Sequence, residues 1–208
     1  TTNPFSAPTT IAQSMKAAQP APNVTIGDDG KIYVLYQDTV NEQTNIFLKT
    51  STDNGKSFSE PVRVNLLDGN VALDGRVAPT IQLGDDGEVY VTWANSRYEP
   101  NMFMGNYRQL VFTQSFDDGK SFEPSIVIGA EELHSGKYFQ HMSIDGHGGI
   151  HMAWLDGPAK MNSTGYMEKD KSRDRGVRYT QSLDGGVTFE TTKLIDANAC
   201  PCCNVQTA

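Results

Sequence analysis

Hydrophobic and polar residues alternate over short stretches that recur along the chain. The run IYVLYQ places Tyr33, Leu35 and Gln37 on one face of a strand and the intervening residues on the other. The dipeptides Asp29-Gly30 and Asp86-Gly87, each just ahead of such a run, are strong hairpin signals because Asp and Gly tolerate positive φ. The pattern therefore predicts antiparallel strand pairs, and no stretch of the chain has a helical period.

The strand pairs belong to three repeating units. Each unit consists of two strands around a Gly/Asp turn, a third strand, an eight-residue turn and a fourth strand. The eight-residue turns are STDNGKSF, SFDDGKSF and SLDGGVTF, at 51–58, 115–122 and 182–189. The spacing predicts four-stranded antiparallel meanders over about 21–66, 77–130 and 138–197. Tandem units of this length and content indicate an all-β fold, a β-propeller of four-stranded antiparallel blades.

The eight-residue turns, called octets below, carry one chemical pattern. We expect the Ser and Asp side chains to hydrogen-bond the turn backbone, the Gly to supply backbone freedom, and the Phe to tuck its ring under the turn. These positions are Ser51, Asp53, Gly55, Phe58, Ser115, Asp117, Gly119, Phe122, Ser182, Asp184, Gly186 and Phe189. The octets are therefore expected to be structural and not catalytic.

The octet pattern, Ser-x-Asp-x-Gly-x-Ser/Thr-Phe, resembles the Asp-box, or bacterial neuraminidase repeat, of the sialidase superfamily. The resemblance covers nearly all of the chain after residue 21 and implies a ring of six blades. The stretch 200–208 looks like the start of a fourth blade. Because three blades do not close a ring, we expect the rest of the propeller to come from a missing C-terminal half, a second chain or a symmetry mate.

Composition and charge narrow the possible partners. The net charge of −8 argues against nucleic acid, and no apolar run is long enough to span a membrane. Residues 1–20 are rich in Thr, Ala and Pro and are expected to form a flexible arm. The chain starts at Thr1, as a mature chain after signal-peptide removal would. We therefore expect a secreted, periplasmic or cell-surface protein.

Candidate ligand-binding residues follow from the resemblance. Sialidases hold an acidic sugar with three arginines, and a Tyr/Glu pair and an Asp perform the chemistry. The second unit comes closest, with Arg76, Arg97, Glu99 and Arg108 as the candidates. However, Arg76 stands in an Arg-x-x-Pro sequence and not in Arg-x-Pro, and Glu99 is the only acid between Arg97 and the second octet. We therefore expect a noncatalytic module that binds glycan or protein, or acts as a scaffold; the alternative is a sialidase-type exo-glycoside hydrolase completed by residues outside this chain.

The three cysteines, Cys200, Cys202 and Cys203, are crowded into the sequence ACPCC. A disulfide, within the cluster or to a missing partner, is the first interpretation. A copper or zinc site, with help from nearby His and Met residues, is the second, and it would make the chain a metal-binding periplasmic protein. A free reactive thiol is the third. His141 and His151 stand at alternating positions of predicted strands and are expected to be half-buried sheet residues more than ligands.

Overall fold

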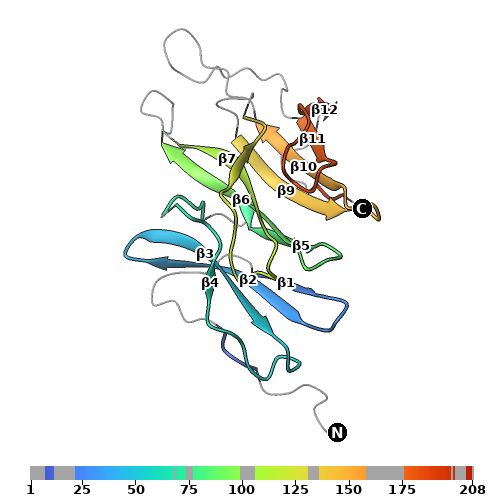
Figure 1. Ribbon diagram of the computed structural model, residues 1–208. Coiled ribbons are helices and arrows are strands. Elements are labelled where there is room, and N and C mark those ends of the chain that lie inside the picture. The colour runs from blue at the N-terminus through green and yellow to red at the C-terminus, as the bar shows by residue number, and fades with distance from the viewer. Residues whose placement is uncertain are drawn as a thin grey trace, which may run out of the picture.

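The computed structural model describes residues 8–11, 22–67, 69–73, 77–98, 106–130, 136–157, 176–197, 199 and 205–207. These residues form three four-stranded antiparallel sheets and no α-helix (Figure 1). In each sheet the strands are hydrogen-bonded in the order in which they occur along the chain, so each sheet is a simple meander. The all-β fold predicted from the alternating pattern is thus confirmed.

In the first two sheets two long central strands lie between shorter ones, whereas in the third sheet the flanking strand β9 is the longest. The first sheet contains β1 (Asn23–Ile26), β2 (Ile32–Val40), β3 (Gln43–Ser51) and β4 (Val62–Arg63). The second contains β5 (Thr80–Leu83), β6 (Val89–Tyr98), β7 (Asn106–Ser115) and β8 (Ile126–Ile128). The third contains β9 (Gly136–Ile144), β10 (Ile150–Gly157), β11 (Gly176–Ser182) and β12 (Lys193–Asp196).

The fourth strands are shorter than the sequence pattern suggests. Only Val62 and Arg63 of the run PVRVN form β4, although the Val64 amide also donates to the Ile46 carbonyl of β3 at 2.9 Å. The third sheet, by contrast, begins earlier than the predicted boundary at about residue 138. Its strand β9 pairs with β10 as far as Gly136, which lies opposite Gly157. The ends of the strands therefore depend on which backbone amides and carbonyls find a hydrogen-bond partner. The alternation of polar and apolar residues does not by itself set them.

The sheets are arranged side by side through their first strands. β5 contacts both β1 and β9, so the three first strands lie next to one another (Figure 1). Side-chain amides near these strands also form hydrogen bonds between the second and third sheets. Gln82 Nε2 donates to the Met142 carbonyl at 3.1 Å, and Gln140 Nε2 donates to the Ala78 carbonyl at 2.8 Å. This is the inner side of a radial arrangement of sheets.

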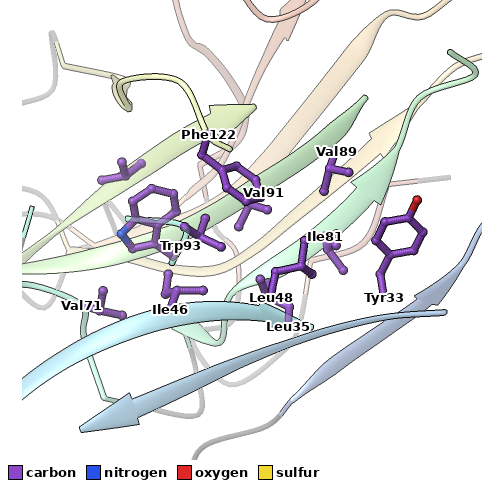
Figure 2. Packing of buried hydrophobic residues seen from close by; sticks show 12 residues of the cluster. Tyr33, Leu35, Ile46, Leu48, Val71, Ile81, Val89, Val91, Trp93 and Phe122 are labelled. Carbon is purple, nitrogen blue, oxygen red and sulfur yellow. The ribbon is translucent and has the colours of Figure 1, made fainter. Parts of the chain in front are cut away.

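Two apolar clusters hold neighbouring sheets together. Between the first and second sheets, Leu35 and Leu48 pack with Val91, Trp93 and other buried residues (Figure 2). A second cluster joins the second and third sheets, and its members are Tyr90, Leu110, Phe112, Ile128, Met142, Ile150, Met152 and Trp154. The second sheet thus buries both of its faces, which accounts for its nearly continuous apolar strands.

All three octets form the same hydrogen-bonded turn. In the second octet, the Ser115 hydroxyl donates to Asp117 Oδ1 at 2.7 Å and accepts from the Gly119 amide at 3.0 Å. Asp117 in turn accepts from the Ser121 amide at 2.8 Å and from the Ser121 hydroxyl at 2.6 Å. Equivalent bonds join Ser51, Asp53, Gly55 and Ser57 in the first octet and Ser182, Asp184, Gly186 and Thr188 in the third. The first serine of each octet (Ser51, Ser115 and Ser182) is buried, whereas the bonds that the aspartates accept from Ser57, Ser121 and Thr188 are exposed.

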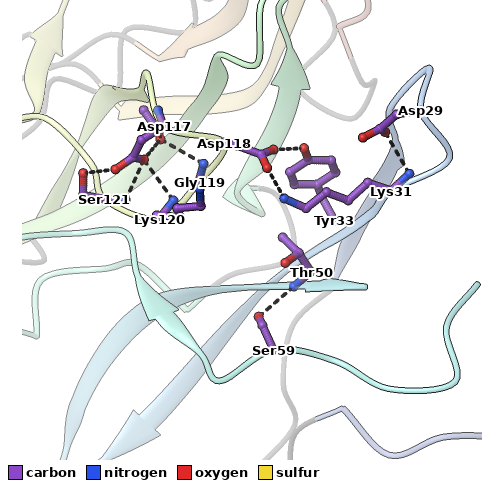
Figure 3. A network of polar contacts seen from close by, with 11 residues as sticks. Asp29, Lys31, Tyr33, Thr50, Ser59, Asp117, Asp118, Gly119, Lys120 and Ser121 are labelled. Carbon is purple, nitrogen blue, oxygen red and sulfur yellow. Dashed lines mark hydrogen bonds and ion pairs between the residues drawn. The ribbon is translucent and has the colours of Figure 1, made fainter. Parts of the chain in front are cut away.

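The second and third octets also attach their sheets to the preceding sheet. A methyl group added at Gly119 would lie 2.5 Å from Leu48 Cδ2 in the first sheet, and φ of Gly119 is +79°, so only glycine fits. Phe122 joins the apolar cluster between the first and second sheets. Asp118 accepts hydrogen bonds from Lys31 and Tyr33 of the first sheet (Figure 3). The octet is therefore a contact between sheets as well as a turn.

No helix within the described residues has the length and apolar character needed to cross a membrane.

Removing the octet serine should destabilise the fold. Ser115→Ala would leave the Gly119 amide without its acceptor at a buried position, and we expect a loss of about 1 to 3 kcal/mol in the free energy of unfolding. Urea unfolding would measure it. Thr52→Ala, at an exposed position of the first octet, is the control and should change stability by less than about 0.5 kcal/mol. Equal effects of the two variants would contradict the structural role of the serine.

Acid should weaken the octets. Hydrogen bonds from the Ser121 and Ser115 side chains hold the pKa of Asp117 at about 2. Because this folded-state pKa lies below the usual value of about 4, the stabilisation is present above that pH and is lost as pH falls toward about 2. Melting temperature should therefore fall over this range, and Asp117→Asn should flatten the profile. An unchanged slope in Asp117→Asn would argue against this linkage.

Candidate functional site

Charged and amide side chains gather at the end of the sheets opposite the octets. This end, called the loop end, is where β2, β6 and β10 finish and β3, β7 and β11 begin. Octets follow the third strands, so antiparallel pairing places the two sets of connections at opposite ends. The loop end can therefore vary without disturbing the octet contacts between sheets.

A buried carboxylate occupies the end of β10. Asp156 is 5% exposed, and its Oδ2 lies 2.7 Å from Arg178 Nε in β11. Asp156 Oδ1 is buried and has no hydrogen-bond partner among the described residues. Lys137, which is 3% exposed, is the cross-strand partner of Asp156 in β9. Two cations on neighbouring strands thus flank one buried carboxylate.

The lysine of this group is held against the second sheet. Lys137 Nζ donates to the Gly129 carbonyl at 3.2 Å and lies 5.6 Å from the centre of the Trp154 ring. Gly129 directly follows β8, and a methyl group added there would lie 3.3 Å from a Trp154 ring carbon. The group Lys137, Asp156 and Arg178, called the charged cluster below, therefore lies beside the boundary between the second and third sheets.

Two further buried polar side chains are the amides of Gln37 in the first sheet and Gln140 in the third. Gln37 at the end of β2 is 1% exposed and donates from Nε2 to the Ala72 carbonyl at 3.1 Å. Gln140 in β9 donates to the Ala78 carbonyl. The Oε1 atoms of Gln37 and Gln140 are buried and accept no hydrogen bond within the described residues. Buried acceptors without partners are costly, and such groups are often found where a ligand or ordered water binds.

The candidates expected from the sequence are only partly placed. Arg108 at the start of β7 is half-buried, and its guanidinium carbon lies 5.6 Å from the centre of the Tyr138 ring. Arg97 lies in β6 with its backbone paired to Tyr107. Arg76 and Glu99 lie outside the described residues. Arg108 therefore joins the second and third sheets near the charged cluster, and the assignment of the four residues to ligand binding stays a prediction.

Cys200, Cys202 and Cys203 also lie outside the described residues. His141 Nδ1 lies 2.8 Å from the Thr207 hydroxyl, and burial lowers the pKa of His141. His151 contacts the Tyr179 hydroxyl and Asp145. Both histidines are half-buried strand residues, in line with the sequence-based expectation. No group of three His, Cys, Asp or Glu side chains in the described part of the chain is arranged to hold a metal ion.

Sequence reasoning missed the charged cluster. Its signal was the run HMAWLDG, in which an acid directly follows an apolar strand. Lys137 precedes the strand that the sequence pattern predicts, so its pairing opposite Asp156 could not be foreseen. The three residues come from three different strands, and only strand register brings them together.

No protein-family model matches the chain, and no curated protein matches it in sequence. Solved structures do match in shape. A protein of unknown function from Dyadobacter fermentans matches with a TM-score of 0.64 at 13% identity, over 92% of this chain and 54% of that one. A PL25 ulvan lyase bound to -[GlcA(1-4)Rha3S]- matches with a TM-score of 0.56 at 13% identity, over 81% of this chain and 42% of the lyase chain. An α-L-arabinanase from Penicillium chrysogenum, complexed with arabinobiose, matches with a TM-score of 0.52 at 13% identity, over 82% of this chain and 49% of the arabinanase chain.

These matches define the class of fold. The chain has a β-propeller fold, and its described residues form three four-stranded antiparallel sheets. At 13% identity the likeness shows the fold alone. The chain spans about half the length of the solved structures, 42% to 54% of each.

Removing the buried carboxylate should destabilise the loop end. Asp156→Ala would remove the carboxylate of the ion pair with Arg178, and we expect a loss of about 2 to 4 kcal/mol in the free energy of unfolding, less than for a fully buried pair because Arg178 is partly exposed. Chemical denaturation would measure it. Asp28→Ala removes an acid at an exposed turn and should have little effect. A loss below about 0.5 kcal/mol for Asp156→Ala would show that the pair contributes nothing net.

Proposed function

We propose that this chain is part of an extracytoplasmic Asp-box propeller of the sialidase superfamily that binds carbohydrate at its loop end. The observation that carries the proposal is the likeness to two carbohydrate-acting proteins of different chemistry. One of these structures holds a saccharide containing GlcA and Rha3S, and the other holds arabinobiose. The carbohydrate ligand is inferred here by analogy of fold, and the side chains at the loop end give a separate argument for it.

The charges at the loop end favour an acidic saccharide. Arg108, Lys137 and Arg178 are cations at or near the boundary between the second and third sheets. Guanidinium groups offer paired donors that match a carboxylate or sulfate. The unpartnered amide oxygens of Gln37 and Gln140 would accept hydrogen bonds from sugar hydroxyls. Residues outside this chain would complete the binding surface.

A noncatalytic role is the first choice, and hydrolysis is the second. The Arg-x-x-Pro spacing and the lack of an Asp between Arg97 and the second octet support binding without turnover. The buried Asp156, with one carboxylate oxygen that has no hydrogen-bond partner in the described structure, favours hydrolysis. Glycoside hydrolysis ordinarily needs two carboxyl groups on either side of the scissile bond, so a partner for Asp156 would have to come from elsewhere.

Calorimetric titration of the protein with a GlcA-containing oligosaccharide and with arabinobiose tests the proposal. We expect the acidic saccharide to bind and Arg97→Ala to weaken it by about tenfold or more, about 1.4 kcal/mol. Lys120→Ala, a cation on the second octet at the opposite end, is the matched control and should bind normally. If neither saccharide binds, carbohydrate binding is wrong. If a fluorogenic sialoside is turned over and Arg97→Ala abolishes turnover, the noncatalytic role is wrong.

A further inference from the structure

The second and third sheets place a tryptophan and a polar residue at equivalent positions. Trp93 pairs with the residue four positions before its octet serine, and Trp154 does the same in its own sheet. Asn95 follows Trp93 by two residues, and Asp156 follows Trp154 by two residues. Residues two apart in a strand share a face of the sheet. Each of the two sheets therefore carries an indole and a side-chain oxygen on one face, near the loop end.

The two sheets differ in the hydrogen bond made at these positions. In the second sheet, Trp93 Nε1 donates to Asn95 Oδ1 at 2.8 Å. In the third sheet, Trp154 Nε1 and Asp156 Oδ1 are both buried, and neither has a hydrogen-bond partner within the described residues. A buried indole N–H without an acceptor is costly, and most buried donors have one. The third sheet thus contains a donor and an acceptor placed like those of the second sheet, but without the bond between them.

Arg178 accounts for the difference. It stands where the second sheet has Val111, and its Nε lies 2.7 Å from Asp156 Oδ2. A guanidinium attracts a carboxylate more strongly than a neutral indole N–H does, because both partners are charged. Asp156 therefore has two candidate partners on one face of the sheet, Arg178 and Trp154, and the structure shows it with Arg178.

A β-bulge in β9 adds a second cation beside this carboxylate. The register of β9 shifts so that Phe139 and Gln140 both stand opposite Trp154, and Phe139 has a φ of +53°. A positive φ is unfavourable for a bulky residue, and such strain and β-bulges are both concentrated next to functional sites. The shift brings Lys137 opposite Asp156. The buried carboxylate therefore keeps a cation on the neighbouring strand whichever of its two partners it takes.

The two members of the ion pair differ in exposure. The side chain of Arg178 is 27% exposed, whereas that of Asp156 is 7% exposed. An anion from solution can therefore approach the guanidinium more readily than the carboxylate. A carboxylate or sulfate group offers the guanidinium the same kind of paired acceptor oxygens that Asp156 offers.

We infer that Asp156 is an internal stand-in for the acidic group of the ligand. When a carboxylate or sulfate of a saccharide pairs with Arg178, Asp156 leaves the guanidinium and accepts a hydrogen bond from Trp154 Nε1. The bond between Trp93 and Asn95 shows the geometry that the new bond takes. Because the new bond gives the buried indole its acceptor, it offsets part of the cost of releasing Arg178.

This exchange selects for an acidic ligand. A neutral sugar cannot replace the carboxylate at Arg178, because the guanidinium would lose its counter-charge. Asp156 also competes with the ligand, so it lowers the affinity of every saccharide that needs Arg178. The inference rests on the proposed binding of an acidic saccharide at the loop end, and it adds the exchange by which Arg178 selects that saccharide.

The indole N–H signals of the two tryptophans test the exchange in a ¹H–¹⁵N NMR titration with the GlcA-containing oligosaccharide. A hydrogen bond moves an indole proton downfield, and Trp93→Phe assigns the two signals. We expect the Trp154 proton to move downfield while the Trp93 proton stays in place, and arabinobiose should move neither. If calorimetry shows binding and the Trp154 signal does not move, the exchange is wrong and the proposed function stands. If the oligosaccharide does not bind, both are wrong.

Asp156→Asn distinguishes an exchange from a purely structural role. An amide forms no ion pair with Arg178 but can accept from Trp154 Nε1, as Asn95 does from its own tryptophan. The Trp154 signal should therefore lie downfield before any saccharide is added, and affinity for the oligosaccharide should rise by about fivefold or more. Asp28→Asn, at an exposed turn, is the matched control and should change neither.

Thermal unfolding by circular dichroism checks that Asp156→Asn folds, and the wild-type titration decides the matter if it does not. A folded Asp156→Asn that binds the oligosaccharide more weakly than wild type overturns the inference, because Asp156 would then act with the ligand and not against it.

Discussion

The whole arrangement depends on a buried serine hydroxyl that bonds an aspartate and a glycine amide in one turn. This turn lets the chain reverse direction between the third and fourth strands with its backbone groups satisfied. It also presents a glycine with positive φ, and because that glycine has no side chain the turn can rest directly on the preceding sheet. Where Asp118 follows the octet aspartate, Lys31 and Tyr33 add a polar link between sheets. Folding within a sheet and packing between sheets are therefore decided by the same eight residues.

Packing between sheets explains why the pattern of apolar and polar residues in the second sheet differs from the pattern in the other two. It lies between two apolar clusters, so Val91 and Trp93 face the first sheet while Tyr90 and Phe112 face the third. Its faces cannot be divided into one polar and one apolar side. The third sheet, by contrast, faces a neighbour with Met152 and Trp154 and carries polar groups around His151 and Tyr179 on its other face. Such a face is a natural place for further assembly.

The two ends of the sheets are under different constraints. At the octet end, any change must preserve contacts with the preceding sheet. At the loop end, the buried Asp156 pairs with the partly exposed Arg178, and the buried Lys137 donates to the Gly129 carbonyl beside the second sheet. Buried ion pairs of this kind contribute little net stability. Propeller loops at the strand ends commonly offer a ligand surface, which is why carbohydrate binding is proposed at this end.

Local chemistry alone determined much of this protein. Alternation along IYVLYQ, the Asp-Gly turns and the Ser-x-Asp-x-Gly pattern each act within about ten residues, so the sequence was sufficient to predict three four-stranded meanders and the hydrogen-bonded turns within them. Tertiary structure decided the rest. The short β4, the pairing of Lys137 with Asp156 and the match between the Tyr90–Phe112 and His151–Tyr179 stacks arise from register and from contacts between distant segments. Such contacts depend on where whole strands come to lie, and no local pattern of residues encodes that position.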